Sequence, residues 1–101
     1  MNVRLLAPAA AELDEAVAWY AAQAPGLEQR FIGAVRKAQK RIAERPHAWR
    51  PLGDGVRRFR LERFPYGLIY VVEAGEVVVL AVAHLHRQPN YRRSRLSRKD
   101  P

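Results

Sequence analysis

The segment that most constrains the fold is a continuous apolar run from Val77 to Ala83. It shows no alternation of polar and apolar residues, which is typical of a central strand covered on much of both faces. Such a strand needs a sheet around it and at least one further layer packed against that sheet. The run is also far shorter than the roughly 18 residues that a membrane-spanning helix requires. It therefore predicts a buried β-strand in a globular domain that does not associate with a membrane.

A charged strand is expected upstream of this run. Phe59 and Leu61 alternate with Arg58, Arg60 and Glu62, which predicts a half-buried strand. Its apolar side would face a core, and its charged side would lie on the sheet surface that no helix covers. We therefore expect a cationic platform on that surface.

Two helices are expected before this strand. Residues 8–23 and 27–45 carry apolar side chains at helical spacing, and Ala24-Pro25-Gly26 breaks the helix between them. Two helices joined by a short break favour an antiparallel hairpin. Each has one apolar stripe, so the pair must cover another layer. The remaining strands are expected at residues 2–6, 68–73 and 77–85, with an edge strand at 2–6 and a loop at 46–55.

The order of elements predicts an α+β fold. We expect an N-terminal strand and an antiparallel helical hairpin packed on one face of a mostly antiparallel sheet of three to four strands. A chain of 101 residues, of which 49% are hydrophobic, has room for one modest core. Residues 1–95 are expected to form this single domain, and residues 96–101 a basic, flexible tail.

The chain is strongly basic, with a formal net charge of +8 from 18 basic and 10 acidic residues. Residues 1–29 contain one arginine and four acidic residues, so the positive charge belongs to the rest of the chain. Most of the basic residues are arginine, which binds phosphate and carboxylate groups through two parallel hydrogen bonds. Such a field favours an anionic partner: nucleic acid, a ribosome-like particle or an acidic protein.

The first candidate binding surface is the arginine-rich strand. Arg57, Arg58, Arg60 and Arg63 place guanidinium groups where they would hold phosphates or an acidic protein segment. The alternative is a solvated strand face whose charges prevent edge-to-edge aggregation.

The basic C-terminal segment extends this candidate surface. Arg92 and Arg93 follow Tyr91, and such a mixture of an aromatic ring with cations is typical of nucleic-acid-binding segments. The alternative is a frayed terminus that only increases solubility.

A candidate for acid–base chemistry lies at the end of the last strand. His84, His86, Arg87 and Tyr91 follow one another there, and a histidine near neutral pH acts as a general acid or base. An arginine beside it would stabilise negative charge that develops on phosphorus. Together with Arg60, this set would suit RNA cleavage, in which the ribose 2′-hydroxyl is an internal nucleophile. The alternative is that the two histidines, which share one face of a strand, only cap the sheet edge.

No cofactor or metal is expected. The sequence has no cysteine, no phosphate-binding glycine loop, no Gly-x-Ser-x-Gly and no zinc-ligand spacing. These absences exclude a disulfide framework and a cysteine nucleophile, and they disfavour a nucleotide-hydrolysing enzyme. The N-terminus has no basic flank followed by an apolar segment, so we expect a cytoplasmic protein without a signal peptide.

Several segments together resemble the RelE/ParE superfamily of toxins from type II toxin–antitoxin systems. The resemblance spans about residues 3–95, and its most specific parts are Arg-Phe-Pro-Tyr at 63–66 and His-x-x-Arg-x-Pro-x-Tyr at 84–91. It implies growth arrest by the free protein and neutralisation by an antitoxin whose C-terminal segment wraps the toxin. Because the expected platform is cationic, that segment should be acidic and amphipathic. Operator DNA would be contacted only indirectly, through the antitoxin.

The superfamily has two branches with different targets. RelE-like members cleave mRNA on the ribosome with a lysine, arginine and tyrosine set, or with glutamate, arginine and histidine. ParE-like members inhibit DNA gyrase and lack these sets. Lysine occurs here only at positions 37, 40 and 99, and arginine does not readily lose its proton to act as a base. Glu62, Arg60 and His86 remain as an alternative nuclease set. The resemblance favours gyrase inhibition first, mRNA cleavage second and a scaffold domain without activity third.

Overall fold

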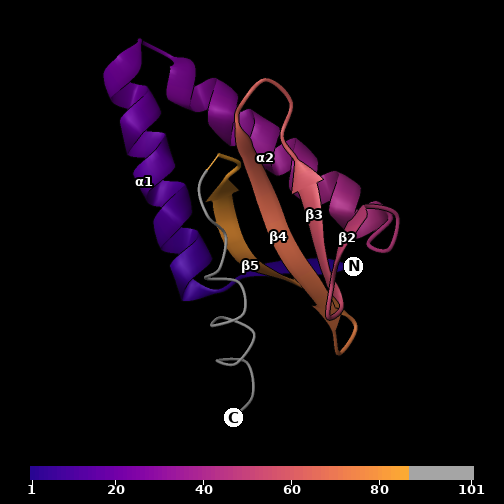
Figure 1. The fold of residues 1–101 in the computed structure, drawn as a ribbon. Coiled ribbons are helices and arrows are strands. Elements are labelled where there is room, and N and C mark those ends of the chain that lie inside the picture. The colour runs from indigo at the N-terminus through magenta and orange to yellow at the C-terminus, as the bar shows by residue number, and fades with distance from the viewer. Residues whose placement is uncertain (87–101) are drawn as a thin grey trace.

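Two helices pack against one five-stranded sheet in the structure, a computed structural model that describes residues 1–86 (Figure 1). This arrangement confirms the α+β fold with an N-terminal strand and a helical hairpin. The elements in chain order are β1 (Asn2–Leu5), α1 (Ala7–Gln23), α2 (Leu27–Glu44), β2 (Arg50–Gly53), β3 (Val56–Arg60), β4 (Tyr66–Glu73) and β5 (Glu76–His84).

The sheet has the strand order β1-β5-β4-β3-β2. β1 lies at one edge and pairs in parallel with β5, whereas the other neighbours are antiparallel. The sheet has five strands where three to four were expected, because residues 50–53 form β2 instead of part of a loop. β2 contains Pro51, which a sheet tolerates at an edge because the missing N–H donor is not needed there.

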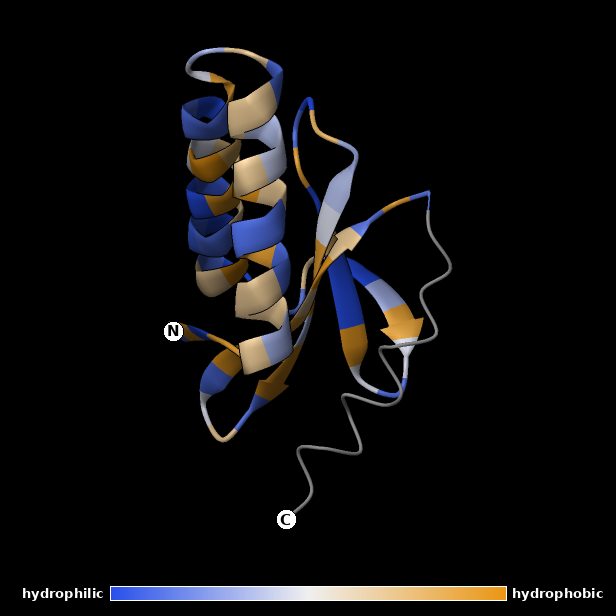
Figure 2. Ribbon diagram, turned by 90° about the vertical axis from the view of Figure 1, so that its left-hand side faces the viewer, coloured by the Kyte–Doolittle hydropathy of each residue, from blue (hydrophilic) through white to orange (hydrophobic). Residues whose placement is uncertain are grey.

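The helical hairpin covers one face of the sheet only (Figure 2). Pro8 lies in the first turn of α1, where its missing N–H donor costs nothing. Gly26 precedes α2 with a φ of 82°, a left-handed conformation that favours glycine and lets the chain reverse within a few residues. The broken helical pattern at 24–26 therefore marks the reversal correctly.

The core beneath the helices combines apolar helix stripes with alternate strand residues. Phe31 and Ile42 of α2 are fully buried, as are Tyr70 of β4 and Val77 and Val79 of β5. Along β4 every second side chain faces this helix side, as the period of two requires. In β5 the alternation shifts between Val79 and Val82, where the β4–β5 register is irregular. Each helix contributes the stripe that the sequence indicated.

The opposite face of the sheet differs from the expected charged platform. It carries a second apolar cluster, which includes the buried side chains of Val56, Ile69, Val78 and Leu80. No helix residue belongs to this cluster among the described residues. The expectation of an arginine-covered open face was wrong for most of its area, because β4 and β5 are apolar on both sides. The charged side chains of this face lie toward its edges: arginines at the β2–β3 end, and at the β1 edge Arg4, which pairs with Val78 and forms an ion pair with Glu76.

Some sequence-based predictions lie outside the described residues. These are the functional roles of Arg87, Tyr91, Arg92 and Arg93 and the domain boundary at residue 95. Within residues 1–86, no helix is long and apolar enough to span a membrane.

Candidate functional site

Three arginines gather at the β2–β3 end of the face that the helices leave uncovered. Arg50 pairs directly with Arg58 across the two strands, and Arg60 follows two residues later on the same side of β3. Arg58 in turn pairs with Ile69, a member of the apolar cluster on this face. We call Arg50, Arg58 and Arg60 the arginine triad. The sequence analysis identified Arg58 and Arg60 but missed Arg50, because it placed that residue in a loop.

The surroundings of the triad disfavour the positive charge of Arg58. Burial lowers the pKa of Arg58 from its ordinary value, and the neighbouring charges of Arg50 and Arg60 lower it further. The Nε atom of Arg58 is buried and has no hydrogen-bond partner. The ion pairs found among residues 1–86 join Arg4 to Glu76 and Lys37 to Glu62, so none of them neutralises the triad. Like charges in opposed cross-strand positions destabilise a sheet, and a bound anion would relieve this repulsion.

Gly67 explains how Arg58 fits on the sheet. A Cβ atom at this position would lie 3.2 Å from Cγ of Arg58 and 3.3 Å from the carbonyl oxygen of Phe59. The absence of a side chain on β4 therefore leaves room for the aliphatic part of Arg58 to lie across the strand. A glycine inside an apolar strand often marks such a close approach, so Gly67 is the sequence signal that could have indicated the position of Arg58.

The other two predicted arginines point elsewhere. Arg57 faces the helix side, where its Nη1 atom donates a hydrogen bond to the carbonyl oxygen of Trp49 at 2.8 Å. Arg63 lies in the connection after β3 with a φ of 68° and lines a groove beside α2. The four arginines predicted as one surface therefore belong to three locations, because successive residues of a strand project to opposite faces.

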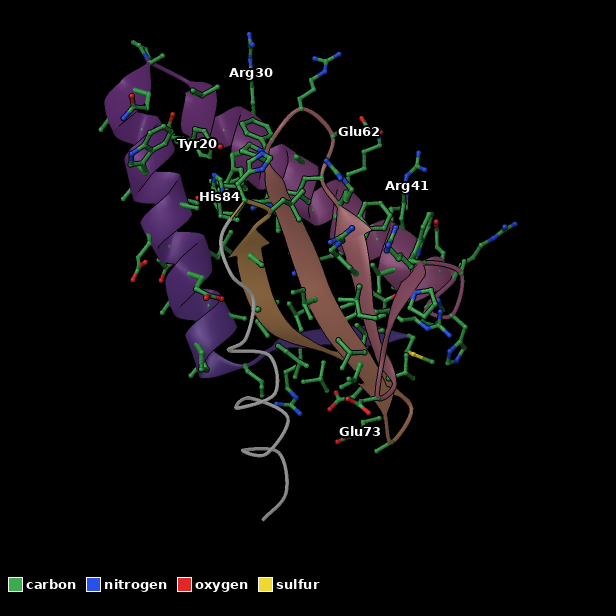
Figure 3. All side chains as sticks on the ribbon, in the orientation of Figure 1. Tyr20, Arg30, Arg41, Glu62, Glu73 and His84 are labelled. Carbon is green, nitrogen blue, oxygen red and sulfur yellow. The ribbon has the colours of Figure 1, made fainter. Side chains whose placement is uncertain are left out.

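The groove beside α2 has a volume of about 440 Å³. Phe59 and Phe64 form apolar parts of its lining, together with Gly33, Ala34 and Ala38 of α2. We call it the α2 groove. Figure 3 shows Arg30, Glu62 and Arg41 along its rim. The basic side chains that line it are Arg30, Lys37, Arg41 and Arg63.

The structure describes Arg60, Glu62, His84 and His86 of the predicted nuclease residues. Glu62 contacts Lys37 of α2 at 3.4 Å, away from the triad face. Arg60 pairs with Gly67 on the triad face, whereas His84 lines a different groove, beside α1. His86 lies next to His84, with 5.5 Å between the ring centroids and its backbone N–H donating to Nδ1 of His84 at 3.2 Å. The two histidines therefore form a pair without Arg60 or Glu62.

Trp49 and Tyr70 hold the β2–β3 end in place. The Trp49 ring packs edge-on against Phe59 with 4.6 Å between the ring centroids. The Tyr70 hydroxyl donates a hydrogen bond to the carbonyl oxygen of Pro46 at 2.6 Å, and burial raises the pKa of Tyr70 to about 12. Both contacts fasten the segment before β2 to the core, so they also position Arg50. Among residues 1–86, no group of three histidine, aspartate or glutamate side chains is arranged to bind a metal ion.

Comparison with known proteins finds a matching family model and similar solved structures. The sequence matches, over residues 3–89, the model of a family described as the ParE toxin of the type II toxin–antitoxin system parDE. The fold is similar to a solved structure described as the chromosomal ParDE toxin–antitoxin system from P. aeruginosa, with a TM-score of 0.73. That likeness covers 85% of this chain and 97% of the other at 23% sequence identity, so it concerns the fold. No curated protein matches the sequence.

Proposed function

The chain belongs to the ParE family of toxins from type II toxin–antitoxin systems, and from this premise we propose that it arrests growth by inhibiting DNA gyrase. We further propose that a cognate antitoxin neutralises it and that both events take place in the cytoplasm. The observation that carries the proposal is the arginine triad, whose charge no acidic residue in the described part of the chain neutralises.

The triad supports a function that depends on binding. A guanidinium group does not readily lose its proton and binds oxyanions through two parallel hydrogen bonds, so the triad suits contact with phosphates or carboxylates. Of the predicted nuclease residues, Arg60 belongs to the face away from the helices, whereas His86 contacts His84, which lines the groove beside α1. Gyrase inhibition without RNA cleavage is therefore the favoured activity, and nuclease action by Arg60, His86, Arg87 and Tyr91 is the competing prediction.

The antitoxin should present an acidic, amphipathic segment. Two described surfaces fit such a partner: the arginine triad and the α2 groove, whose apolar lining is surrounded by four basic side chains. An amphipathic segment would place apolar side chains in the groove and its carboxylates on the rim. Arg57 is less suited to this contact, because its guanidinium group is already bonded to Trp49.

Transcript-end mapping after induction, combined with a supercoiling assay, tests the target. The chain is expressed alone, and mRNA ends and DNA breaks are mapped before growth stops. We expect growth arrest with intact mRNA, gyrase-dependent DNA damage and loss of supercoiling by purified gyrase. Cleavage of mRNA at codon boundaries would overturn gyrase inhibition in favour of nuclease action. Normal growth at full expression would contradict both activities.

Co-expression tests the partner. The open reading frame beside the gene is expressed with the chain, and the complex is purified and its growth phenotype measured. We expect the neighbouring protein to restore growth and to have an acidic C-terminal half. A strongly basic C-terminal half in a neutralising partner would contradict the proposed docking surfaces.

A further inference from the structure

A second groove, between α1 and the ends of β4 and β5, has no part in the proposed function. Its volume is about 410 Å³. One wall comes from α1 positions 12, 15, 16, 19 and 20, which share one face of the helix, and the other from positions 65, 66, 82 and 84. Figure 3 shows Tyr20 of α1 and His84 of β5 at this space. We call it the α1 groove.

The α1 groove has the opposite character to the rest of this basic protein. Glu12 and Glu15 supply carboxylates, and Trp19, Tyr20 and Tyr66 supply aromatic rings. No lysine or arginine is among the described residues that line it, whereas the α2 groove has four. The groove therefore disfavours anions and suits a positively charged ligand.

The aromatic walls are held in place by packing within the core. Tyr20 is only 7% exposed, and its ring lies 4.9 Å from the Phe31 ring beneath it. The Trp19 ring stands edge-on to Tyr20 at 5.1 Å, and Tyr66 is 6.2 Å from Tyr20 on the opposite wall. Rings that are already fixed lose little conformational entropy when a ligand binds between them.

The carboxylates are placed by α1 and its contact with the sheet. Oε1 of Glu12 accepts a hydrogen bond from the backbone N–H of Val82 at 3.0 Å, which fixes this side chain at the edge of β5. Glu15 lies one helical turn further along the same face and is exposed. It forms no ion pair with any residue from 1 to 86. Trp19, another turn along, is 57% exposed, which is unusual for so large an apolar side chain.

We propose that the α1 groove binds one arginine side chain presented by a protein partner. A cation is attracted to the face of an aromatic ring and to a carboxylate, and a groove that offers both selects for positive charge. Arginine fits better than lysine, since its planar guanidinium group stacks on a ring while its edge donates hydrogen bonds to a carboxylate. An exposed tryptophan beside the groove is typical of a residue that dominates a protein interface.

This site does not depend on gyrase being the target, and its test uses a direct binding measurement. The full-length protein, labelled with ¹⁵N, is titrated with the capped tripeptide acetyl-Gly-Arg-Gly-amide. The matched probe contains citrulline, which has the shape of arginine without its charge. The indole N–H of Trp19 and the backbone N–H of Val82 report on occupancy of the groove.

We expect saturable shifts of these two signals with the arginine peptide and affinity for the citrulline peptide lower by about tenfold. Glu15→Gln, which removes the charge and keeps the size, should weaken arginine binding by about fivefold. Trp19→Leu should weaken it by a similar factor, since it removes the ring. Asp14→Asn is the control: it makes the same change of charge on α1 at a residue outside the groove, and binding should change by less than about twofold.

Several results would overturn the assignment. Equal affinity for the arginine and citrulline peptides would mean that the groove does not select for charge. If Asp14→Asn and Glu15→Gln had equal effects on affinity, the peptide would be responding to the overall negative charge of α1 and not to the groove. Tetramethylammonium that binds more tightly than the arginine peptide would identify a site for a small cation. Each result is independent of whether the chain inhibits gyrase in the supercoiling assay.

Discussion

The β2–β3 end of the sheet and the α1 side of the molecule carry opposite charge. At the first end, Arg50, Arg58 and Arg60 crowd together without a neutralising acid among residues 1–86. On the α1 side, Glu12 and Glu15 line a groove walled by aromatic rings. The net charge of +8 describes neither surface, because local sign depends on which elements lie side by side.

The comparison shows how one core supports two kinds of recognition. The arginine triad sits on strands, where like charges repel across the ladder and a bound anion restores balance. The α1 groove instead has rings that pack into the core and carboxylates that point from one helix face. A protein partner that engages both surfaces needs acidic residues for one and a basic residue for the other.

The largest effect on the free energy of unfolding is expected from truncating a core side chain beneath the α1 groove. Phe31 is fully buried, and its ring lies about 5 Å from those of Tyr20, Phe64 and Tyr66. Phe31→Ala should lower the free energy of unfolding by about 3–5 kcal/mol, because it leaves a cavity among these rings. Denaturant titration measures the loss. Trp19→Ala, an exposed ring in the same cluster, is the control and should cost less than about 1 kcal/mol.

The second-largest effect is expected from reversing the charge of the triad, and a control variant separates this effect from that of the net charge. Arg58→Glu combined with Arg60→Glu should weaken binding to an acidic antitoxin by about 2–5 kcal/mol if the contacts exclude water. Isothermal titration calorimetry on the purified pair measures this change. Arg36→Glu combined with Arg45→Glu is the control: it makes the same change of net charge at two exposed arginines outside the triad and the α2 groove, and it should leave the affinity nearly unchanged. Equal losses from the two double variants would show that only net charge matters.

Arg58 should also reveal a conflict between function and stability. Arg58→Met keeps the aliphatic stem over Gly67 and removes a charge that burial and two arginines disfavour. We expect a gain in unfolding free energy of up to about 1 kcal/mol together with weaker growth arrest. Thermal denaturation and induced expression measure the two quantities. A loss of stability would indicate that the charge is already compensated.

Tyr70 tests how the β2–β3 end is fastened. Tyr70→Phe removes the hydrogen bond to the Pro46 carbonyl oxygen and should cost about 1–2 kcal/mol at neutral pH. Because burial raises the pKa of Tyr70 from 10.0 to about 12, the neutral phenol stabilises the fold fully below pH 10. That contribution is lost as the pH rises from 10 to about 12. Unfolding free energies measured across this range should fall more steeply for the native protein than for Tyr70→Phe.

The smallest effect is expected at the rim of the α2 groove. Lys37 and Glu62 form an ion pair at 3.4 Å, and their side chains are 53% and 65% exposed. Lys37→Met should change the unfolding free energy by less than about 0.5 kcal/mol, because solvent screens such pairs. A double-mutant cycle with Glu62→Gln measures the coupling. A coupling energy well above this value would assign the pair a structural role.

Much of the fold could be predicted from local patterns. The apolar stripes and the break at Ala24-Pro25-Gly26 located both helices to within a residue or two, and the uninterrupted run at 77–83 identified a strand buried on both faces. The short gap left between the strands expected at 68–73 and 77–85 is a tight turn, in which Ala74 and Gly75 have positive φ angles. These features depend on neighbours a few residues apart, which a sequence displays directly.

The surfaces were harder to predict, because they depend on contacts between distant residues. Arg50 joined the triad only through the pairing of β2 with β3. The proline and glycine in residues 50–53 favoured a loop, so the sequence did not reveal this strand. The α1 groove required Tyr66 and His84 to meet a helix more than forty residues earlier in the chain.

By itself, the sequence determined the types of element, their order and the excess of positive charge, since helical and strand periods arise from local backbone geometry. Only the tertiary structure decided which arginines stand together, which one bonds to Trp49 and which acids face the aromatic rings. Strand register and helix docking set those neighbours, and both are fixed by the best burial of apolar surface across the whole chain.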